Sequence, residues 1–155
     1  MISDAVAIIC LGKTNNLWLL KVLFKTIFIP ASVKKEVLVE GKEGYSNILG
    51  AIEEGWVKVI EPKTNINLGL GAGENDAITL ARERKDTVIL DDAFAIKVAK
   101  VLNIPTIRTT TAIFLAVNKK AISKDEAIAI LNSLIESGYY ISPKEYSIIF
   151  TRLKQ

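Results

Sequence analysis

The stretch TVILDD, residues Thr87–Asp92, decides the fold that we expect. Its first part, Thr87–Leu90, is a compact β-branched and apolar run, as found in strands that are buried in a sheet. The run ends directly on two acidic residues, Asp91 and Asp92, and an apolar helix over Ala93–Leu102 is predicted to follow at once. A short buried strand that leads straight into a helix is typical of a parallel sheet covered by helices.

The same alternation of strand and helix continues in both directions along the chain. Short apolar runs predict further strands at Met1–Ser3, Lys25–Ile29, Trp56–Ile60 and Thr106–Ile107. Apolar residues at helical spacing predict helices at Asn15–Phe24, from Pro30 to about Glu40, at Tyr45–Glu54, from about Glu74 to Arg84, and at Thr111–Asn118. We therefore predict a single α/β domain over residues 1–155, a three-layer α/β/α sandwich with a central, mainly parallel sheet.

The C-terminal part of the chain adds helices without matching strands. One of them begins at Ser123, because Ser123 and Glu126 have the spacing of a capping box in which Glu126 reaches back to the Ser123 backbone. Gly138 ends this helix, and Ser142 and Pro143 begin the last one. We expect this helical excess to cover one side of the sheet or to form a dimer face.

The composition excludes several classes of enzyme. The chain has no histidine, which rules out Ser-His-Asp catalysis, histidine-based ribonuclease chemistry and histidine-ligated zinc hydrolases. One cysteine, Cys10, cannot form an internal disulfide, and the chain has neither a signal-like start nor an apolar run that would span a bilayer. We therefore expect a cytoplasmic protein without a membrane partner. Its net charge of +3 is compatible with a polyanionic partner but does not demand one.

Acidic residues stand where parallel α/β sheets gather their ligands. Asp4 follows the first strand and Asp91–Asp92 follow the Thr87–Leu90 strand, and the carboxyl ends of parallel strands open a crevice there. Glu36 lies two turns into a helix, and Glu74 opens another one after alternating glycines. Carboxylates held close together repel one another unless they are protonated or bind a cation. Mg²⁺ and Mn²⁺ prefer such oxygen ligands and can activate water for phosphodiester hydrolysis.

Each of these residues also has an ordinary structural interpretation. Asp4 would serve as a helix N-cap, and one residue of the Asp91–Asp92 pair would cap the helix that begins at Ala93. Glu74 at the start of a helix suits the helix dipole without any catalytic role. Glu36 on a helix is more often a solvated residue than a ligand. These alternatives stay open on the sequence alone.

Five segments in order carry a resemblance to a known family. They are Ile2–Asp4, Ile29–Val37, Gly71–Ala81, Val88–Asp92 and Ile107–Thr109, and the tail Gly138–Ser142 follows them. Along nearly its full length the chain resembles the PIN-domain superfamily, especially the small prokaryotic proteins of the DUF3368 type. The resemblance implies an α/β/α sandwich whose acidic pocket binds Mg²⁺ or Mn²⁺ and hydrolyses RNA.

The resemblance assigns roles to particular residues. The four acids of the family fall on Asp4, Glu36, Glu74 and Asp92, with Asp91 beside the last and Asp76 a weaker candidate for the third. Asp4 and Asp92 would be the principal metal ligands, with Glu74 and Asp91 as further metal ligands, and Glu36 and Glu74 would complete the site directly or through water, one of them orienting the attacking water. A hydroxyl near the pocket, which would contact the substrate, falls on Thr109. Arg108 and Lys97 would contact RNA phosphates, although a solvated surface explains such cations equally well.

Two departures from the family pattern favour a competing hypothesis. The run Ala5–Ile9 lacks the small hydroxyl residues that usually follow the first Asp, and Ala93–Ile96 replaces a frequent basic run. A PIN-like module that binds RNA or protein without cutting is therefore the alternative to a metal-dependent ribonuclease. The resemblance also implies a homodimer and an antitoxin protein as partners. The Gly69–Gly73 loop lacks the spacing of a dinucleotide-binding motif.

Overall fold

All residues from 1 to 155 are described by a computed structural model. At its centre is a five-stranded sheet in which every neighbouring pair of strands is parallel. The strands stand in the order β3-β2-β1-β4-β5, and their bounds are Ile2–Ser3 (β1), Ile27–Ile29 (β2), Val57–Val59 (β3), Val88–Ile89 (β4) and Thr106–Ile107 (β5). The predicted strands are all present, each slightly shorter than or equal to its predicted range.

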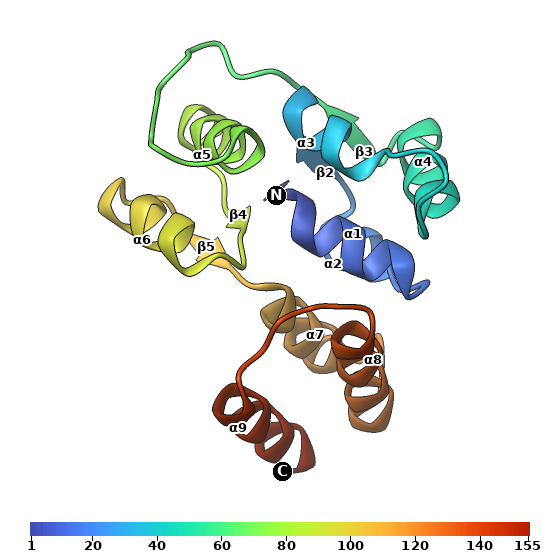
Figure 1. The fold of residues 1–155 in the computed structure, drawn as a ribbon. Coiled ribbons are helices and arrows are strands. Elements are labelled where there is room, and N and C mark those ends of the chain that lie inside the picture. The colour runs from blue at the N-terminus through green and yellow to red at the C-terminus, as the bar shows by residue number, and fades with distance from the viewer.

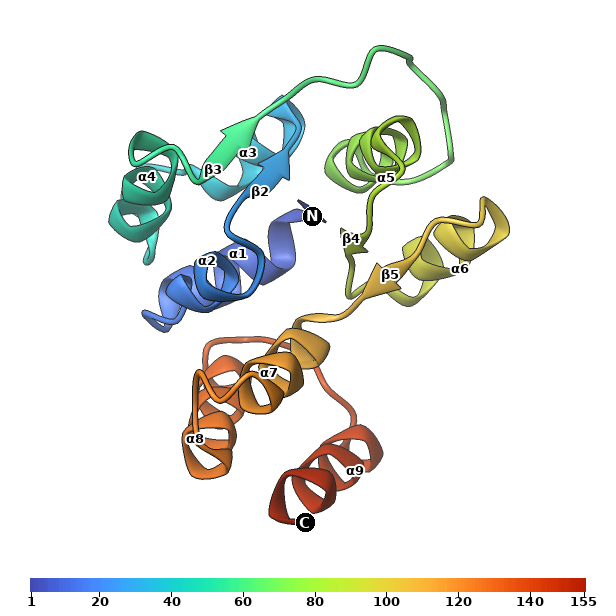
Figure 2. The same cartoon turned by 180° about the vertical axis from the view of Figure 1, so that it is seen from behind.

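Nine helices connect and surround these strands (Figures 1 and 2). They are α1 (Ala5–Lys13), α2 (Trp18–Phe24), α3 (Ala31–Val37), α4 (Tyr45–Glu53), α5 (Ala72–Arg84), α6 (Ala93–Val101), α7 (Thr109–Asn118), α8 (Lys124–Glu136) and α9 (Pro143–Lys154). None of them combines the length and the apolar character that crossing a bilayer requires.

Side chains of the strands alternate between two apolar layers. Ile27 and Ile29 join the larger buried cluster, whereas Phe28 packs against the smaller one. In β4 and just after it, Ile89 belongs to the larger cluster, and Val88 and Leu90 belong to the smaller. This alternation is the two-residue period of a sheet that is buried on both faces. The predicted three-layer α/β/α sandwich is confirmed.

The two layers are covered by different helices. The smaller cluster includes buried residues of α5 and α6, such as Ala77, Ile78 and Ala95. The larger cluster takes in α1, α2, α3 and α4. Beyond α2 it continues into α7, α8 and α9, which pack in sequence on one another and form a separate lobe away from the sheet (Figures 1 and 2). Whether this lobe provides a dimer face stays a prediction.

Differences from the predicted elements have local causes. No helix was predicted at Ala5–Lys13, because its first seven residues are apolar and show no polar face that would reveal a helical period. The helix predicted from Asn15 begins only at Trp18, and Asn15 itself takes a left-handed conformation with φ of 58°. Helix α3 ends at Val37 instead of continuing to about Glu40. The capping boxes at Ser123 and Ser142 both form, with Glu126 and Glu145 as partners.

Candidate active site

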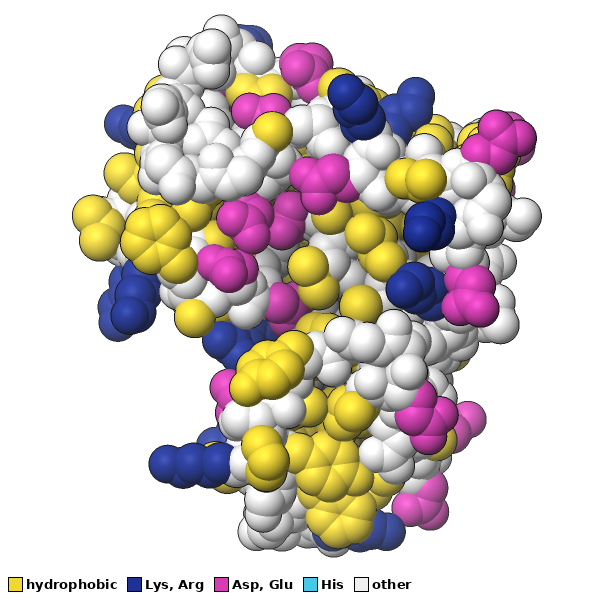
Figure 3. Space-filling model, in the orientation of Figure 1, with side chains coloured by type: hydrophobic (Ala, Val, Ile, Leu, Met, Phe, Trp, Pro, Cys, Tyr) yellow, Lys and Arg dark blue, Asp and Glu magenta, His cyan; other side chains and the backbone are white.

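Acidic residues from separate parts of the chain meet at the carboxyl edge of the sheet. Asp4 directly follows β1, and the Asp91–Asp92 pair lies just beyond β4, with Ser3 and Ile89 paired in adjacent parallel strands. The backbone N–H of Asp4 donates to the carbonyl of Ile89 at 3.1 Å, which fixes these two strand ends side by side. Figure 3 shows acidic side chains gathered in the middle of this face of the molecule, above the C-terminal lobe.

Helices α3 and α5 bring the two glutamates to the same place. These helices pack against each other, and their closest approach involves Gly73. A Cβ atom at position 73 would clash with Oε1 of Glu36 and would press on Cγ2 of Val33. The absence of a side chain at Gly73 therefore lets the Glu36 carboxylate lie against the first turn of α5, next to Glu74. Nearby, Ser32 donates to Asp76 at 2.6 Å, so Asp76 ties the same two helices together.

Asp4 is the most buried of the acids. Only 4% of its surface is exposed, and burial raises the pKa of its carboxyl group from 3.8 to about 7. Repulsion from Glu74, Glu36 and Asp91 raises the pKa further, and the nearby N–H of Ala5 lowers it in part. Although Asp4 occupies the N-cap position of α1, its side chain makes no capping hydrogen bond. The protein therefore compensates the negative charge of Asp4 only in part, through the backbone N–H of Ala5.

Glu74 is half-buried and shows the same effect more weakly. Burial raises the pKa of its carboxyl group, and the negative charges of Asp92 and Glu36 raise it as well. The charges of Glu36, Asp91 and Asp92 each raise the pKa of Asp4, of Glu74 or of both. Acids from β1, α3, α5 and the end of β4 thus form one electrostatic cluster.

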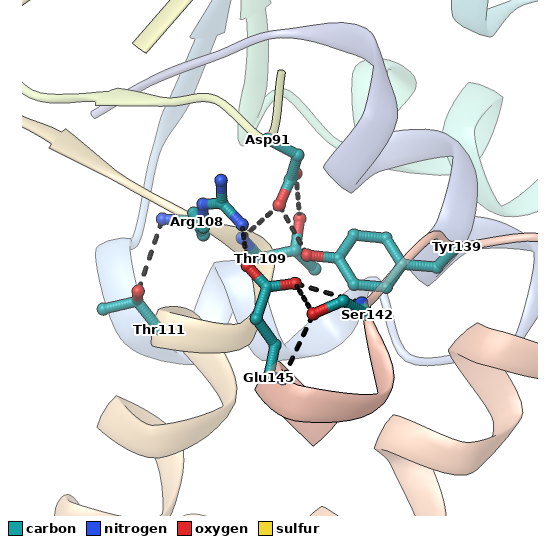
Figure 4. A network of polar contacts seen from close by, with 7 residues as sticks. All are labelled: Asp91, Arg108, Thr109, Thr111, Tyr139, Ser142 and Glu145. Carbon is teal, nitrogen blue, oxygen red and sulfur yellow. Dashed lines mark hydrogen bonds and ion pairs between the residues drawn. The ribbon is translucent and has the colours of Figure 1, made fainter. Parts of the chain in front are cut away.

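The two acids after β4 have different surroundings. Asp92 is exposed and caps α6, because its Oδ1 accepts a hydrogen bond from the backbone N–H of Ala95 at 2.8 Å. Asp91 accepts three hydrogen bonds (Figure 4): from the Thr109 backbone N–H at 3.1 Å, from the Thr109 hydroxyl at 2.6 Å and from the Tyr139 hydroxyl at 2.6 Å. Both oxygens of Asp91 are therefore occupied, whereas the cap of Asp92 uses only one oxygen.

The donor set of this cluster suits a hard divalent cation. All of its donors are carboxylate oxygens, which Mg²⁺ and Mn²⁺ prefer, and no salt bridge reaches the buried Asp4 carboxylate. No three of the acidic groups stand close enough together, as the side chains lie, to hold one ion.

The whole chain matches one family. A family model described as DUF3368, a PIN domain, matches residues 1–155. The chain belongs to this family. PIN domains are generally nucleases and typically use divalent metal ions. Searches of curated proteins and of solved structures each found no match.

A cleft opens beside the acidic cluster of the PIN domain. It has a volume of about 830 Å³ and lies between α1, the start of α6 and the connection from α8 to α9. Glu74, Asp91 and Asp92 line its acidic part, whereas Arg108 and Lys13 contribute positive charge to the same cleft. We call this the acidic cleft. A smaller hollow beside Trp18, on α2 and α4, contains none of the acidic cluster.

The structure separates the three residues predicted to contact substrate. Arg108 lines the acidic cleft and pairs with Glu145 at 3.2 Å. Thr109 is fully buried, so it holds Asp91 in place and does not itself form the wall of the cleft. Lys97 lies in a different hollow on α6, beside exposed Phe94 and Val101. The structure therefore does not bring Lys97 together with Arg108.

Sequence reasoning missed three features of this PIN domain. Tyr139, which is 6% exposed, lies 48 residues from Asp91 in the chain and still donates to its carboxylate. Gly73 was noticed as part of a glycine-rich loop, but its role at the Glu36 carboxylate was not. Lys13 is the third. The Gly138–Ser142 tail did carry part of the family resemblance, and this was the only sequence signal for Tyr139.

Proposed function

We propose that this PIN domain is a ribonuclease that depends on Mg²⁺ or Mn²⁺ and hydrolyses RNA phosphodiester bonds at the acidic cluster. The observation that carries the proposal is the position of Asp4, which is 4% exposed and bound through its backbone N–H to the end of β4 at Ile89, beside the acids Glu74, Glu36 and Asp91. Burial and the charges of these acids raise the pKa of its carboxyl group to about 7. A protein has little structural reason to bury Asp4 beside three other acids whose charges repel it, but a cation-binding site requires such an arrangement. The family to which the chain belongs is consistent with this chemistry.

Asp4, Glu74 and Asp92 would hold the ion, with Glu36 completing the site directly or through water. When bound, a divalent ion supplies an activated water molecule and offsets the charge that develops on the phosphate. Asp4 must give up its proton for this purpose, since its raised pKa keeps it partly protonated near neutral pH. The Ala95 N–H orients the Asp92 carboxylate and leaves its second oxygen free.

Asp91 has a different role in this proposal from the one predicted from the sequence. Its three hydrogen bonds, from Thr109 and Tyr139, satisfy both oxygens and fix the end of β4 against the C-terminal lobe. We therefore assign Asp91 as a positioning residue and leave ion binding to its neighbour Asp92. On the substrate side, Arg108 and Lys13 in the acidic cleft would contact the RNA phosphates.

Cleavage of labelled single-stranded RNA in the presence of Mn²⁺ tests the proposal. Asp4→Asn and Asp92→Asn are each expected to remove nearly all metal-dependent cleavage, because each loses an ion-binding charge. Asp125→Asn is the matched control, since the Asp125 side chain is 90% exposed on α8, away from the cluster. Cleavage that persists in both cluster variants would reject the proposed site and point to a contaminating nuclease.

A binding module without catalytic activity is the alternative. The separation of the acids, of which no three stand close enough to hold an ion, favours it. If the protein binds RNA with equal affinity with and without Mn²⁺ and never cuts it, this alternative replaces the ribonuclease. The toxin–antitoxin role and the homodimer stay proposals from the family resemblance. Exposed Phe94 and Val101 on α6 offer an apolar surface on which such partners can be mapped.

A further inference from the structure

One exposed aromatic side chain stands out at the acidic cleft. Tyr140 is 86% exposed and lines this cleft together with Arg108, Asp91 and Asp92. Its neighbour Tyr139 is buried and bound to Asp91, so the two tyrosines have opposite environments. Packing explains Tyr139 but does not explain why a large ring is left in solvent at position 140.

The backbone around Tyr140 is held firmly on both sides. On the N-terminal side, the Tyr139 N–H donates to the carbonyl of Leu134 at 2.9 Å, and its hydroxyl donates to Asp91. On the C-terminal side, Ser142 caps α9 in a reciprocal pair with Glu145, and Glu145 also accepts from Arg108 (Figure 4). Because the backbone here is anchored, only the side-chain rotamer of Tyr140 has to be fixed when the ring binds a partner.

The charges around Tyr140 identify the kind of partner. Arg108 and Lys13 line the same cleft and suit phosphates, and Glu74 and Asp92, which also line it, suit a metal-bound phosphodiester. A flat aromatic surface in such a cleft matches the faces of nucleic-acid bases, which stack on tyrosine whatever their identity. Bases are available for stacking only where the strand is unpaired.

We propose that Tyr140 is a base-stacking residue that binds an unpaired base of the nucleic-acid strand in the acidic cleft, and that the Tyr139–Asp91 hydrogen bond positions it relative to the acidic cluster. This inference rests on the proposed function and adds a substrate-binding residue to it. The side chain binds the strand but does not take part in the cleavage step. Because stacking needs an unpaired base, we expect the protein to prefer single-stranded over fully paired RNA.

Binding of a fluorescein-labelled RNA decamer by fluorescence anisotropy, in EDTA to prevent cleavage, tests this role. Tyr140→Ala is expected to weaken binding of the single strand about 5- to 150-fold, the range found when stacking aromatics are removed. Tyr140→Phe keeps the ring and should bind as the parent does. Phe94→Ala is the matched control, because Phe94 is 58% exposed but lies outside the cleft. A decamer containing 2-aminopurine should lose fluorescence on binding the parent and not on binding Tyr140→Ala.

Three outcomes would overturn the inference. If the parent binds and cuts RNA but Tyr140→Ala binds it equally well, the stacking role is wrong while the ribonuclease proposal survives. If Tyr140→Ala leaves RNA binding intact and changes the oligomeric state, Tyr140 belongs to a protein interface instead. If the parent neither binds nor cuts RNA, the inference fails together with the proposed function. Circular-dichroism melting confirms that each variant is folded.

Discussion

Replacing Asp4 by asparagine should stabilise the protein, and the gain should depend on pH. The native carboxyl group has a pKa of about 7 against 3.8 for an unperturbed aspartate. Between these two pH values the unfolded chain has already lost the proton that the native state keeps. The native state therefore becomes less stable as pH rises through this window. Asparagine cannot ionise, so the variant escapes this loss.

The size of the effect follows from the shift in pKa. A rise from 3.8 to about 7 is about three pH units, and at about 1.4 kcal/mol for each unit it corresponds to about 4 kcal/mol. Since Asp4 is only 4% exposed, solvent screening reduces this little. Below pH 4 the variant and the parent should have the same free energy of unfolding. Between pH 4 and pH 7 the variant should become more stable than the parent by about 1.4 kcal/mol per pH unit, and above pH 7 the difference should stay constant.

Urea unfolding at pH 4, 6 and 8 in EDTA, followed by circular dichroism, measures this difference. Asp125→Asn, an exposed acid on α8, serves as control and should show no such trend. Mn²⁺ should then stabilise the parent at pH 8 and leave Asp4→Asn almost unchanged, because the ion compensates the charge that the variant lacks. An Asp4→Asn variant that is less stable than the parent at pH 8, or equally shifted at every pH, would refute this reasoning.

The remaining predictions concern the supports of the site. Gly73→Ala should weaken Mn²⁺ binding, because its Cβ would displace the Glu36 carboxylate, whereas Gly50→Ala on α4 has open space and should leave Mn²⁺ binding unchanged. Since the end of the Glu36 side chain is free to move, the free energy of unfolding should change by less than about 1 kcal/mol in both variants. Calorimetric titration compares the two variants, and equal Mn²⁺ affinities would contradict the role of Gly73. Tyr139→Phe removes the hydrogen bond to Asp91 and should lower the free energy of unfolding, measured in urea, by about 1–2 kcal/mol. An unchanged free energy of unfolding would contradict the anchoring role of Tyr139. Ser123→Ala should cost about 1 kcal/mol through the lost capping box without changing cleavage, and a cleavage defect would show that α8 affects the site.

The sheet was predictable because its strands carry a local signal. The run Thr87–Leu90 is short, buried and β-branched, and its paired acids mark where the strand ends. Helix α1 was missed for the opposite reason, since the residues after Asp4 are apolar all round and hide their helical period. The ends of helices such as α3 depend on packing and on local backbone conformation, which sequence patterns describe poorly.

The candidate site was predictable to the extent that topology decides it. Asp4 and the Asp91–Asp92 pair follow adjacent parallel strands, so the strand order brings Asp4 and Asp91 close enough for the charge of Asp91 to act on Asp4. The division of labour between Asp91 and Asp92 was not predictable, because it depends on Tyr139 reaching back from the C-terminal lobe. Lys97 was predicted to contact substrate from its charge alone, and the position of its side chain on α6 places it in another hollow.

Proton release on metal binding tests most directly whether the acidic cluster is a metal site. Calorimetric titration with Mn²⁺ in two buffers of different ionisation enthalpy gives the number of protons released per ion. The pKa of Asp4 predicts a release of about one proton at pH 6, and almost none at pH 8.5, where the carboxyl group is already ionised. Equal proton release at both pH values, or Mn²⁺ binding that is unchanged in Asp4→Asn, would contradict a cation site built around Asp4.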